Sequence, residues 1–101
     1  MTKAKIDIPK HLLDDFCKRH HIIKLALFGS VIRKDFDFKS DVDVMVEFKS
    51  DVRVGLIRFA GMELELSKII GRRVDLNTPD FISKYYREKV LADMEVQYDA
   101  A

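Results

Sequence analysis

The chain has 101 residues, of which 48% are apolar and 35% are charged, and its formal net charge is +1. This length is typical of one hydrophobic core, so residues 1–101 are expected to form a single domain. The near balance of charge argues against a protein that holds long nucleic acid by electrostatic attraction alone, because such proteins carry clustered excess Lys and Arg.

Cysteine content and the N-terminal sequence limit the cellular compartment. Cys17 is the only cysteine, which excludes an intramolecular disulfide, and its place on an apolar stripe predicts a buried core residue. The first ten residues lack the apolar segment of a secretory signal, and no apolar run approaches the roughly 18 residues of a membrane span. A cytoplasmic protein without a membrane partner is therefore expected.

The first predicted elements are a helix and a strand. Pro9 suits the first turn of a helix, and the apolar residues that follow recur at helical spacing: Leu12, Leu13, Phe16 and Cys17. The helix is expected to end in the basic cluster 18–21, where His20 and His21 are predicted to be solvated and not metal ligands. Residues 22–28 form a near-continuous apolar run, which is typical of a central strand covered on both faces.

A Gly-Ser pair breaks this strand. Gly29 would let a phosphate approach the backbone, and Ser30 offers an N–H and a hydroxyl to phosphate oxygens. A short helical turn is expected next, with its first amides directed at an anion. Arg33 could reach a triphosphate or could pair with Asp35 or Asp37, and its own position does not decide between these roles.

The second strand is predicted over 42–48, and it begins with an acidic pair. Asp41 and Asp43 share one face, whereas Val42, Val44 and Val46 face a core. Two adjacent carboxylates repel each other and are usually tolerated when a cation lies between them. Carboxylate oxygens suit Mg²⁺, which completes its shell with waters and substrate phosphates. The Gly-Ser turn and the acidic pair together predict a site for a metal-bound triphosphate.

The loop before this strand contains two aromatic residues. Phe36 and Phe38 are expected to anchor it, and Ser40 could orient Asp41 or could simply complete the loop.

A long helix is predicted over 54–70. Its expected apolar face contains Leu56, Ile57, Phe59, Ala60, Leu64, Leu66 and Ile70, and the opposite side contains Arg58, Gly61, Glu65 and Lys68. Met62 is expected in the core, and Gly71 is a natural C-cap. Glu63 falls close to the apolar face, and the sequence suggests no function for it.

The third strand is predicted over 72–77. Val74 and Leu76 face one way, and Arg73, Asp75 and Asn77 face the other. Asp75 would approach the acidic pair if this strand neighboured the second one, although a single Asp on a strand is more often a paired surface residue. Arg73 could pair with one of these acids or bind a phosphate.

The C-terminal part is predicted to contain a helix and a short strand. Thr78, Pro79 and Asp80 read as the N-cap and first turn of a helix that runs to about residue 93. Tyr85 and Tyr86 could stack on a base, but tyrosines at helical spacing are more often packing residues. An edge strand is expected over 95–98. The predicted fold class is α/β (α+β), a small mixed sheet with helices packed mainly on one face.

Three of these segments carry a family resemblance. Gly29-Ser30, Asp41-x-Asp43 and the later Asp75 resemble the minimal nucleotidyltransferases, the smallest members of the DNA polymerase beta-like nucleotidyltransferase superfamily. The resemblance runs from about residue 8 to 98 and is most specific in LALFGSVIRKDF, SDVDVMVEF and GRRVDLNTP. One departure is the turn 31–34, because many relatives carry a small residue and then glycine around its arginine.

The resemblance implies a nucleotidyltransferase fold and assigns roles within it. Asp41, Asp43 and Asp75 would be the catalytic residues and would bind two Mg²⁺ ions. Binding of the ATP substrate would involve Gly29, Ser30 and Arg33.

The resemblance also implies an activity and a partner. Members of this family are antitoxins of toxin–antitoxin pairs that transfer AMP from ATP to a tyrosine of a HEPN-type ribonuclease toxin. A chain of this length would take its acceptor-binding surface from such a partner, and its length disfavours transfer to aminoglycosides. The alternative is a non-catalytic binding module that masks its partner, and Mg²⁺-dependent ATP binding would distinguish the two.

Overall fold

Four strands form one mixed sheet in the computed structural model, which describes residues 6–33, 37 and 39–100, with Phe81 described by its backbone only. The strands are β1 (Ile22–Phe28), β2 (Val42–Phe48), β3 (Val74–Asn77) and β4 (Glu95–Asp99), and the helices are α1 (Lys10–Arg19), α2 (Leu56–Ile70) and α3 (Lys84–Asp93). Two short 3₁₀ turns, η1 (Gly29–Ile32) and η2 (Pro79–Phe81), follow β1 and β3.

The strand order is β3-β2-β1-β4. β1 pairs antiparallel with both β2 and β4, and β2 pairs parallel with β3. The predictions of a central first strand and a C-terminal edge strand are confirmed. β1 and β2 also have their predicted bounds, because apolar runs and strict alternation mark strands clearly.

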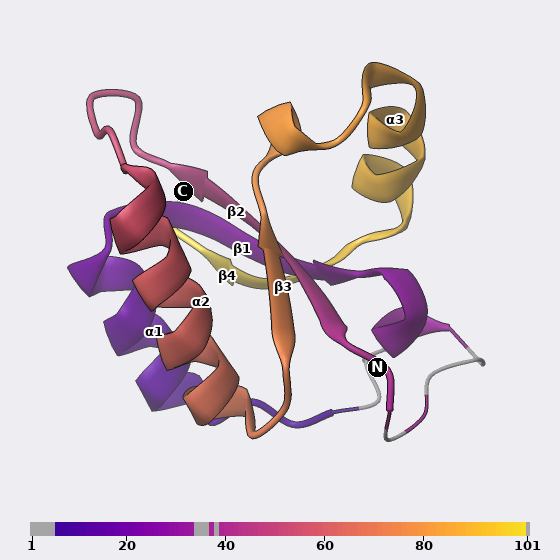
Figure 1. The fold of residues 1–101 in the computed structure, drawn as a ribbon, viewed down its shortest axis with the longest axis horizontal. Helices are drawn as coiled ribbons and strands as arrows, with labels where there is room; N and C mark the ends of the chain where they lie inside the picture. Colours follow the sequence, from indigo (N-terminus) through magenta and orange to yellow (C-terminus); the bar gives the residue numbers. More distant parts are fainter. Residues whose placement is uncertain (1–5, 34–36, 38, 101) are drawn as a thin grey trace.

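The two faces of the sheet are covered unequally. α1 and α2 lie side by side on one face (Figure 1), where Val42, Val44 and Val46 join the larger buried cluster. On the other face, Phe28 and Met45 form a smaller cluster with residues of the η2–α3 segment. The predicted α/β fold with helices mainly on one face is therefore confirmed, and α3 covers only part of the second face.

The predicted apolar face of α2 is wrong in part. Leu56, Ile57 and Leu64 are 80%, 93% and 67% exposed, whereas Met62 and Leu66 are buried. Apolar residues occur on every side of this helix, so helical spacing alone does not select the side that packs. Contact with the sheet makes that selection.

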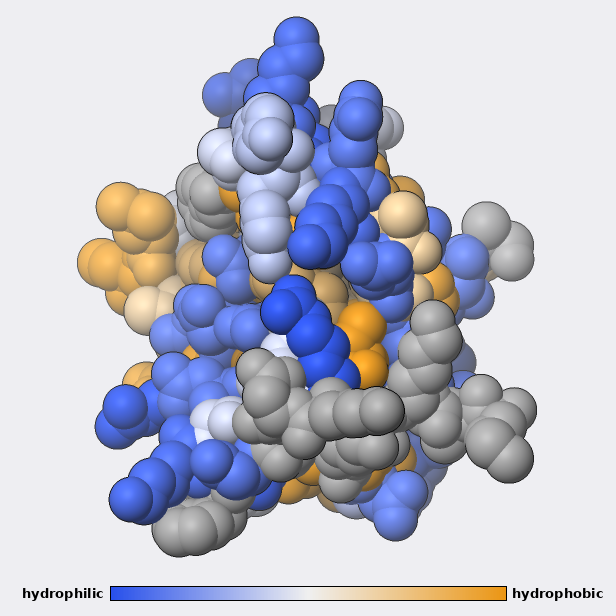
Figure 2. Space-filling model, turned by 90° about the vertical axis from the view of Figure 1, so that its right-hand side faces the viewer, coloured by the Kyte–Doolittle hydropathy of each residue, from blue (hydrophilic) through white to orange (hydrophobic). Residues whose placement is uncertain are grey.

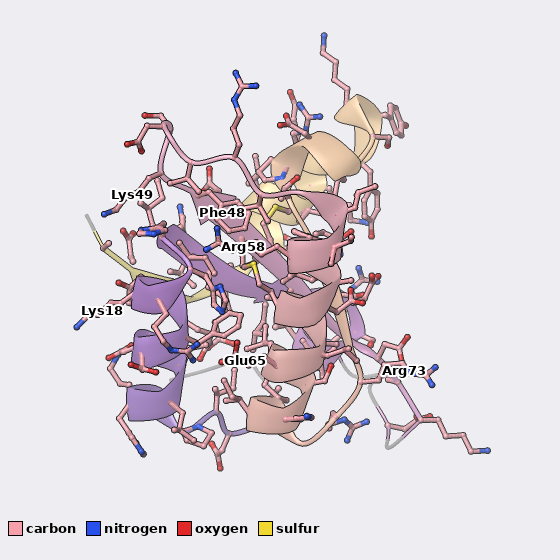
Figure 3. The ribbon with its side chains drawn as sticks, turned by 60° about the vertical axis from the view of Figure 1, so that its left-hand side comes forward. Lys18, Phe48, Lys49, Arg58, Glu65 and Arg73 are labelled. Atoms are coloured by element: carbon pink, nitrogen blue, oxygen red, sulfur yellow. The ribbon has the colours of Figure 1, made fainter. Side chains whose placement is uncertain are left out.

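Glu65 was expected on the solvent side of α2, but it faces α1. Its Oε1 lies 2.9 Å from Nε2 of His20, and its Oε2 accepts a hydrogen bond from the Arg19 guanidinium. Figure 3 shows Glu65 between the two helices. The expectation of a solvated His20 is therefore wrong, because its ring also packs against Phe16, with ring centroids 4.8 Å apart.

Glu63 has a structural role that the sequence does not suggest. β3 is an edge strand, so alternate N–H groups point away from β2 and need acceptors. The N–H of Leu76 donates to Oε2 of Glu63 at 2.8 Å, and the N–H of Val74 donates to Oγ of Ser67 at 3.0 Å. One helix thus satisfies the free edge of the strand that carries Asp75.

The start of α3 also differs from its prediction. Thr78, Pro79 and Asp80 begin the 3₁₀ turn η2, and no side-chain cap hydrogen bond is found at Thr78. The N-cap of α3 is Ser83, whose side chain accepts from the N–H of Tyr86 at 3.3 Å. The interruption lets buried Ile82 join the smaller cluster before the helix begins.

The ends of α1 and α2 and the burial of Cys17 were also predicted from the sequence. Gly71 ends α2 in the left-handed conformation, with φ of 79°, as predicted for a C-cap. Pro9 is the N-cap of α1 and precedes its first turn. Cys17 is fully buried, as predicted, and burial raises the pKa of its thiol to about 12. None of the helices in the described ranges is long and apolar enough to cross a bilayer.

We expect Glu63→Ala to lower the free energy of unfolding by about 1–2 kcal/mol, because it leaves the edge N–H of Leu76 without its acceptor. Glu63→Gln still offers a side-chain oxygen as acceptor, so its free energy of unfolding should fall by less. Urea denaturation measures both. Lys68→Ala, an exposed change on the same helix, should stay within about 0.5 kcal/mol of the parent. Equal losses for Glu63→Ala and Lys68→Ala would contradict this role.

Candidate active site

Two carboxylates meet on the second face of the sheet. Asp43 of β2 is in register with Asp75 of β3 on one side and with Phe28 of β1 on the other. Residues in register on neighbouring strands project from the same face, so the two acids lie side by side. Asp75 was expected near the acidic pair only if its strand neighboured the second strand, and β3 does pair with β2.

Asp41 lies one residue before β2 and is exposed. Its negative charge contributes to a higher pKa at Asp43, which places it near the pair. Within the described ranges, no three His, Cys, Asp or Glu side chains are already grouped as a metal site. The structure thus brings two of the three predicted carboxylates together and leaves the third at the edge of the site.

The environment of Asp43 disfavours its charge. The pKa of Asp43 is raised from its ordinary value of 3.8 to about 6, first by burial and then by the charge and hydrogen bonding of Asp75 and the charge of Asp41, while the charge of Arg33 lowers it. An ionised carboxylate in this position is therefore costly. A divalent cation would relieve that cost, and carboxylate oxygens are the donors that Mg²⁺ prefers. The chemistry of these residues fits such an ion.

Gly29 brings the backbone against this carboxylate. It has φ of 74°, and a Cβ atom built there would lie 2.2 Å from Oδ2 of Asp43. Both the backbone conformation and the available space therefore require glycine. Ser30 follows within η1, where Val31 is buried and fixes the turn to the core. The predicted phosphate-binding turn is thus directly beside the acidic pair.

Arg33 connects this turn to α3. Its guanidinium lies 3.3 Å from the hydroxyl of Tyr86, and its charge lowers the pKa of Asp43. The alternative partner Asp35 lies outside the described residues, as do the predicted anchors Phe36 and Phe38.

The two tyrosines of α3 are not core residues. Tyr85 is 97% exposed and Tyr86 is 41% exposed, so the expectation that both are packing residues is wrong. Figure 2 shows the face that carries α3 and the turn after β1, and this face is mainly hydrophilic.

The loop that leads into β2 is held by polar contacts. Ser40 accepts from the N–H of Asp37 at 3.1 Å and completes the loop, which is one of the two roles predicted for it. Arg72 donates to the carbonyl oxygens of Asp37 and Ser40 at 2.6 Å and 3.1 Å. This role of Arg72 is not predicted from the sequence, although the Arg72-Arg73 pair just before β3 is a signal of a basic surface beside the acids.

The sequence of this chain matches a known family over residues 9–96, and that family is described as "Nucleotidyltransferase domain". A Methanocaldococcus jannaschii protein described as a protein adenylyltransferase (MJ1379) is 32% identical over 95 residues, which cover 92% of each chain. The protein adenylyltransferase MntA of Thermococcus cleftensis is 34% identical over 59 residues, which cover 58% of each chain.

Solved structures share the fold. A chain described as a minimal nucleotidyltransferase superposes with a TM-score of 0.69 at 29% identity, covering 84% of this chain and 85% of that one. A chain from a toxin–antitoxin complex with AMP-PNP superposes with a TM-score of 0.73 at 16% identity, covering 91% and 74%. At that identity the likeness concerns the fold alone.

We expect Gly29→Ala to lower the free energy of unfolding by about 2 kcal/mol or more, because the new methyl group meets Asp43 and the positive φ disfavours alanine. Gly61→Ala is the matched control, since nothing lies within 4 Å of its added Cβ. In the middle of a helix this change should stabilise by about 0.5–1 kcal/mol. Urea denaturation of both variants tests the pair, and equal effects would contradict the crowding at Gly29.

A pH-dependent effect is expected for Asp43→Asn. The native pKa of Asp43 is about 6, against an ordinary value of 3.8, so the native state binds more protons between these values and loses stability as the pH rises to 6. In EDTA at about pH 7.5, Asp43→Asn should stabilise by about 1–2 kcal/mol after allowance for solvent screening.

This advantage should shrink as the pH falls through 6 and vanish near about pH 4, where both states of the parent are protonated. Urea denaturation across this range measures it. A variant less stable than the parent at neutral pH, or a gain that does not depend on pH, would contradict the repulsion.

Proposed function

Because this chain belongs to the nucleotidyltransferase domain family and is a nucleotidyltransferase, we propose that it is a Mg²⁺-dependent protein adenylyltransferase that transfers AMP from ATP to a hydroxyl group of a partner protein. The observation that carries this proposal is the pairing of Asp43 with Asp75 beside Gly29. A binding module without catalysis has no need of two carboxylates that repel each other, whereas a metal-dependent transferase does.

The donor nucleotide would bind at the turn after β1. Gly29 keeps the backbone of this turn against Asp43, and Ser30 supplies an N–H and a hydroxyl to phosphate oxygens. Arg33 lies at the same end of the site, where its guanidinium can contact phosphate oxygens as well as Tyr86. These groups would hold the triphosphate so that its α-phosphorus faces the acidic residues.

Asp41, Asp43 and Asp75 would hold the two metal ions. Bound Mg²⁺ would neutralise charge on the phosphates and lower the pKa of the acceptor hydroxyl. The raised pKa of Asp43 supports this assignment, because a cation would stabilise the ionised carboxylate.

The proposed reaction is a single displacement. The hydroxyl oxygen of the acceptor attacks the α-phosphorus of ATP, a new P–O bond forms, and the bond between the α- and β-phosphates breaks to release pyrophosphate. The hydroxyl proton passes to a carboxylate oxygen of Asp75. Catalysis of this kind depends mainly on positioning and on charge neutralisation, so a small site suffices.

The proposed acceptor is a tyrosine of a HEPN-type toxin, for which this chain would be the antitoxin. Two relatives are described as protein adenylyltransferases. One structure that shares the fold contains a tri-AMPylated Shewanella oneidensis HEPN toxin with its MNT antitoxin, at a TM-score of 0.64 and 16% identity, covering 89% of this chain and 69% of that one.

The test is co-expression with the product of the neighbouring gene, followed by measurement of the intact mass of that product. The parent chain should add whole AMP units, and Asp43→Asn should reduce the rate of addition by about 100-fold or more. Asp51→Asn, a change in the exposed turn beyond the other end of β2, is the matched control and should leave transfer unchanged.

Two outcomes would contradict the proposal. A stable complex with an unmodified partner would favour the alternative, a protein that silences its partner by masking it. Equal transfer by the parent and Asp43→Asn would remove the acidic pair from the reaction.

A further inference from the structure

Three basic side chains surround a pocket beside the acidic residues, on the side of β3. The pocket has a volume of about 330 Å³, enough for a phosphate-sized group, and it is lined by Lys39, Ser40, Asp41, Gly71, Arg72 and Arg73. We name it the Arg73 pocket. Its lining contains three cationic groups and one carboxylate, so the net positive charge favours an anion. A cation bound to Asp41 would neutralise that carboxylate and strengthen the preference.

The walls of the Arg73 pocket are held in place by hydrogen bonds. Arg72 ties the loop before β2 to the start of β3 through the carbonyl oxygens of Asp37 and Ser40. The N–H of Val42 donates to the carbonyl oxygen of Arg73 at 2.9 Å. The pocket is therefore already shaped before a ligand binds, which lowers the entropy cost of binding.

Arg73 faces the reacting side of the molecule. It lies directly before β3 and two residues before Asp75, and its carbonyl oxygen continues the pairing with β2 by accepting from the N–H of Val42, so both side chains are on the same face of the sheet. Figure 3 shows the Arg73 side chain pointing outward, away from α1 and α2. A guanidinium in this position can form paired hydrogen bonds with a phosphate or a carboxylate.

In the order of the strands, the Arg73 pocket and the phosphate-binding turn lie on opposite sides of Asp43. β2, which contains Asp43, lies between β1, which ends just before Gly29, and β3, which begins after Arg73. In phosphoryl transfer the attacking and leaving oxygens are roughly in line across the phosphorus. With the triphosphate on the β1 side of Asp43, an acceptor on the β3 side would meet this requirement.

We infer that the Arg73 pocket binds an anionic group of the acceptor, either a carboxylate or a phosphodiester, and thereby positions the acceptor hydroxyl. This inference rests on the proposed function. Such a group has two possible sources, an acidic side chain next to the acceptor tyrosine or the phosphodiester of an AMP already attached to it.

In the second case, a ribose hydroxyl of the attached AMP attacks the α-phosphorus of a new ATP. A P–O bond forms, the bond between the α- and β-phosphates breaks, pyrophosphate leaves, and the hydroxyl proton passes to Asp75. The Arg73 pocket would then support repeated transfer.

The experiment compares Arg73→Ala with Arg58→Ala, which changes an exposed arginine in the first turn of α2, at the other end of that helix from the Arg73 pocket. Intact mass of the co-purified partner, followed over time, gives the rate of each successive AMP addition. Arg73→Ala should slow at least one of these steps about tenfold or more, because it removes a charge-assisted hydrogen bond. ATP affinity should change by less than about twofold, and Arg73→Lys should recover part of the rate.

The affected step identifies the source of the anion. Loss of the first addition indicates an acidic side chain of the partner, and loss of later additions alone indicates the phosphodiester. Two results would overturn the inference. An equal loss of ATP affinity would assign the Arg73 pocket to the donor, and rates equal to those of Arg58→Ala would leave it without a role.

A second measurement separates this inference from the proposed function. If the parent chain transfers no AMP, the proposed function fails, but the Arg73 pocket can still be examined with inorganic phosphate in the presence of a non-hydrolysable ATP analogue. Amide NMR shifts at residues 39–41 and 71–73 that saturate with phosphate, and that Arg73→Ala abolishes, would support an anion site. The absence of such shifts in the parent would overturn it.

Discussion

The confined carboxylate of Asp43 is the constraint on which the site depends. The backbone at Gly29 leaves no room for a side chain beside it, and Asp75 is directly across from it in the register of β3. Burial and like charge disfavour ionisation there, so the surrounding structure must hold this carboxylate in place. The larger buried cluster does this, because the residues on either side of Asp43 face it. The ionised Asp43 carboxylate thus lowers the stability of the fold, and its position is one that a cation would favour.

The helix layer acts on the site through the edge strand. β3 has only four residues and one strand neighbour, yet it carries Asp75. Glu63 and Ser67 of α2 satisfy its outward N–H groups, and α2 in turn is bonded to α1 through Glu65. The relative position of the two acids therefore depends on polar groups on the opposite face of the sheet. This arrangement gives structural roles to charged residues that carry no chemistry themselves.

In the proposed reaction, the parts of the site follow the order of the strands. The turn after β1 is suited to the donor phosphates, β2 supplies the central carboxylate, and β3 presents Asp75 together with the Arg73 pocket. A displacement at phosphorus has its attacking and leaving oxygens roughly in line, and the proposed donor and acceptor positions on the two sides of Asp43 are compatible with that requirement. The small size of the chain is consistent with a reaction that requires positioning and charge more than many catalytic groups.

Sequence alone determined the features that depend on local geometry. Alternation with a period of two placed Asp43 opposite the valine core, apolar runs located β1 and β2, and the Gly29-Ser30 pair marked the turn that ends β1. Tertiary structure decided the rest. The packing side of α2 could not be predicted because apolar residues occur all around that helix. The N-cap of α3 is Ser83 and not the predicted Thr78, because Ile82 packs in the smaller cluster before the helix begins. The meeting of Asp43 with Asp75 depends on strand order, a long-range property that no local spacing encodes.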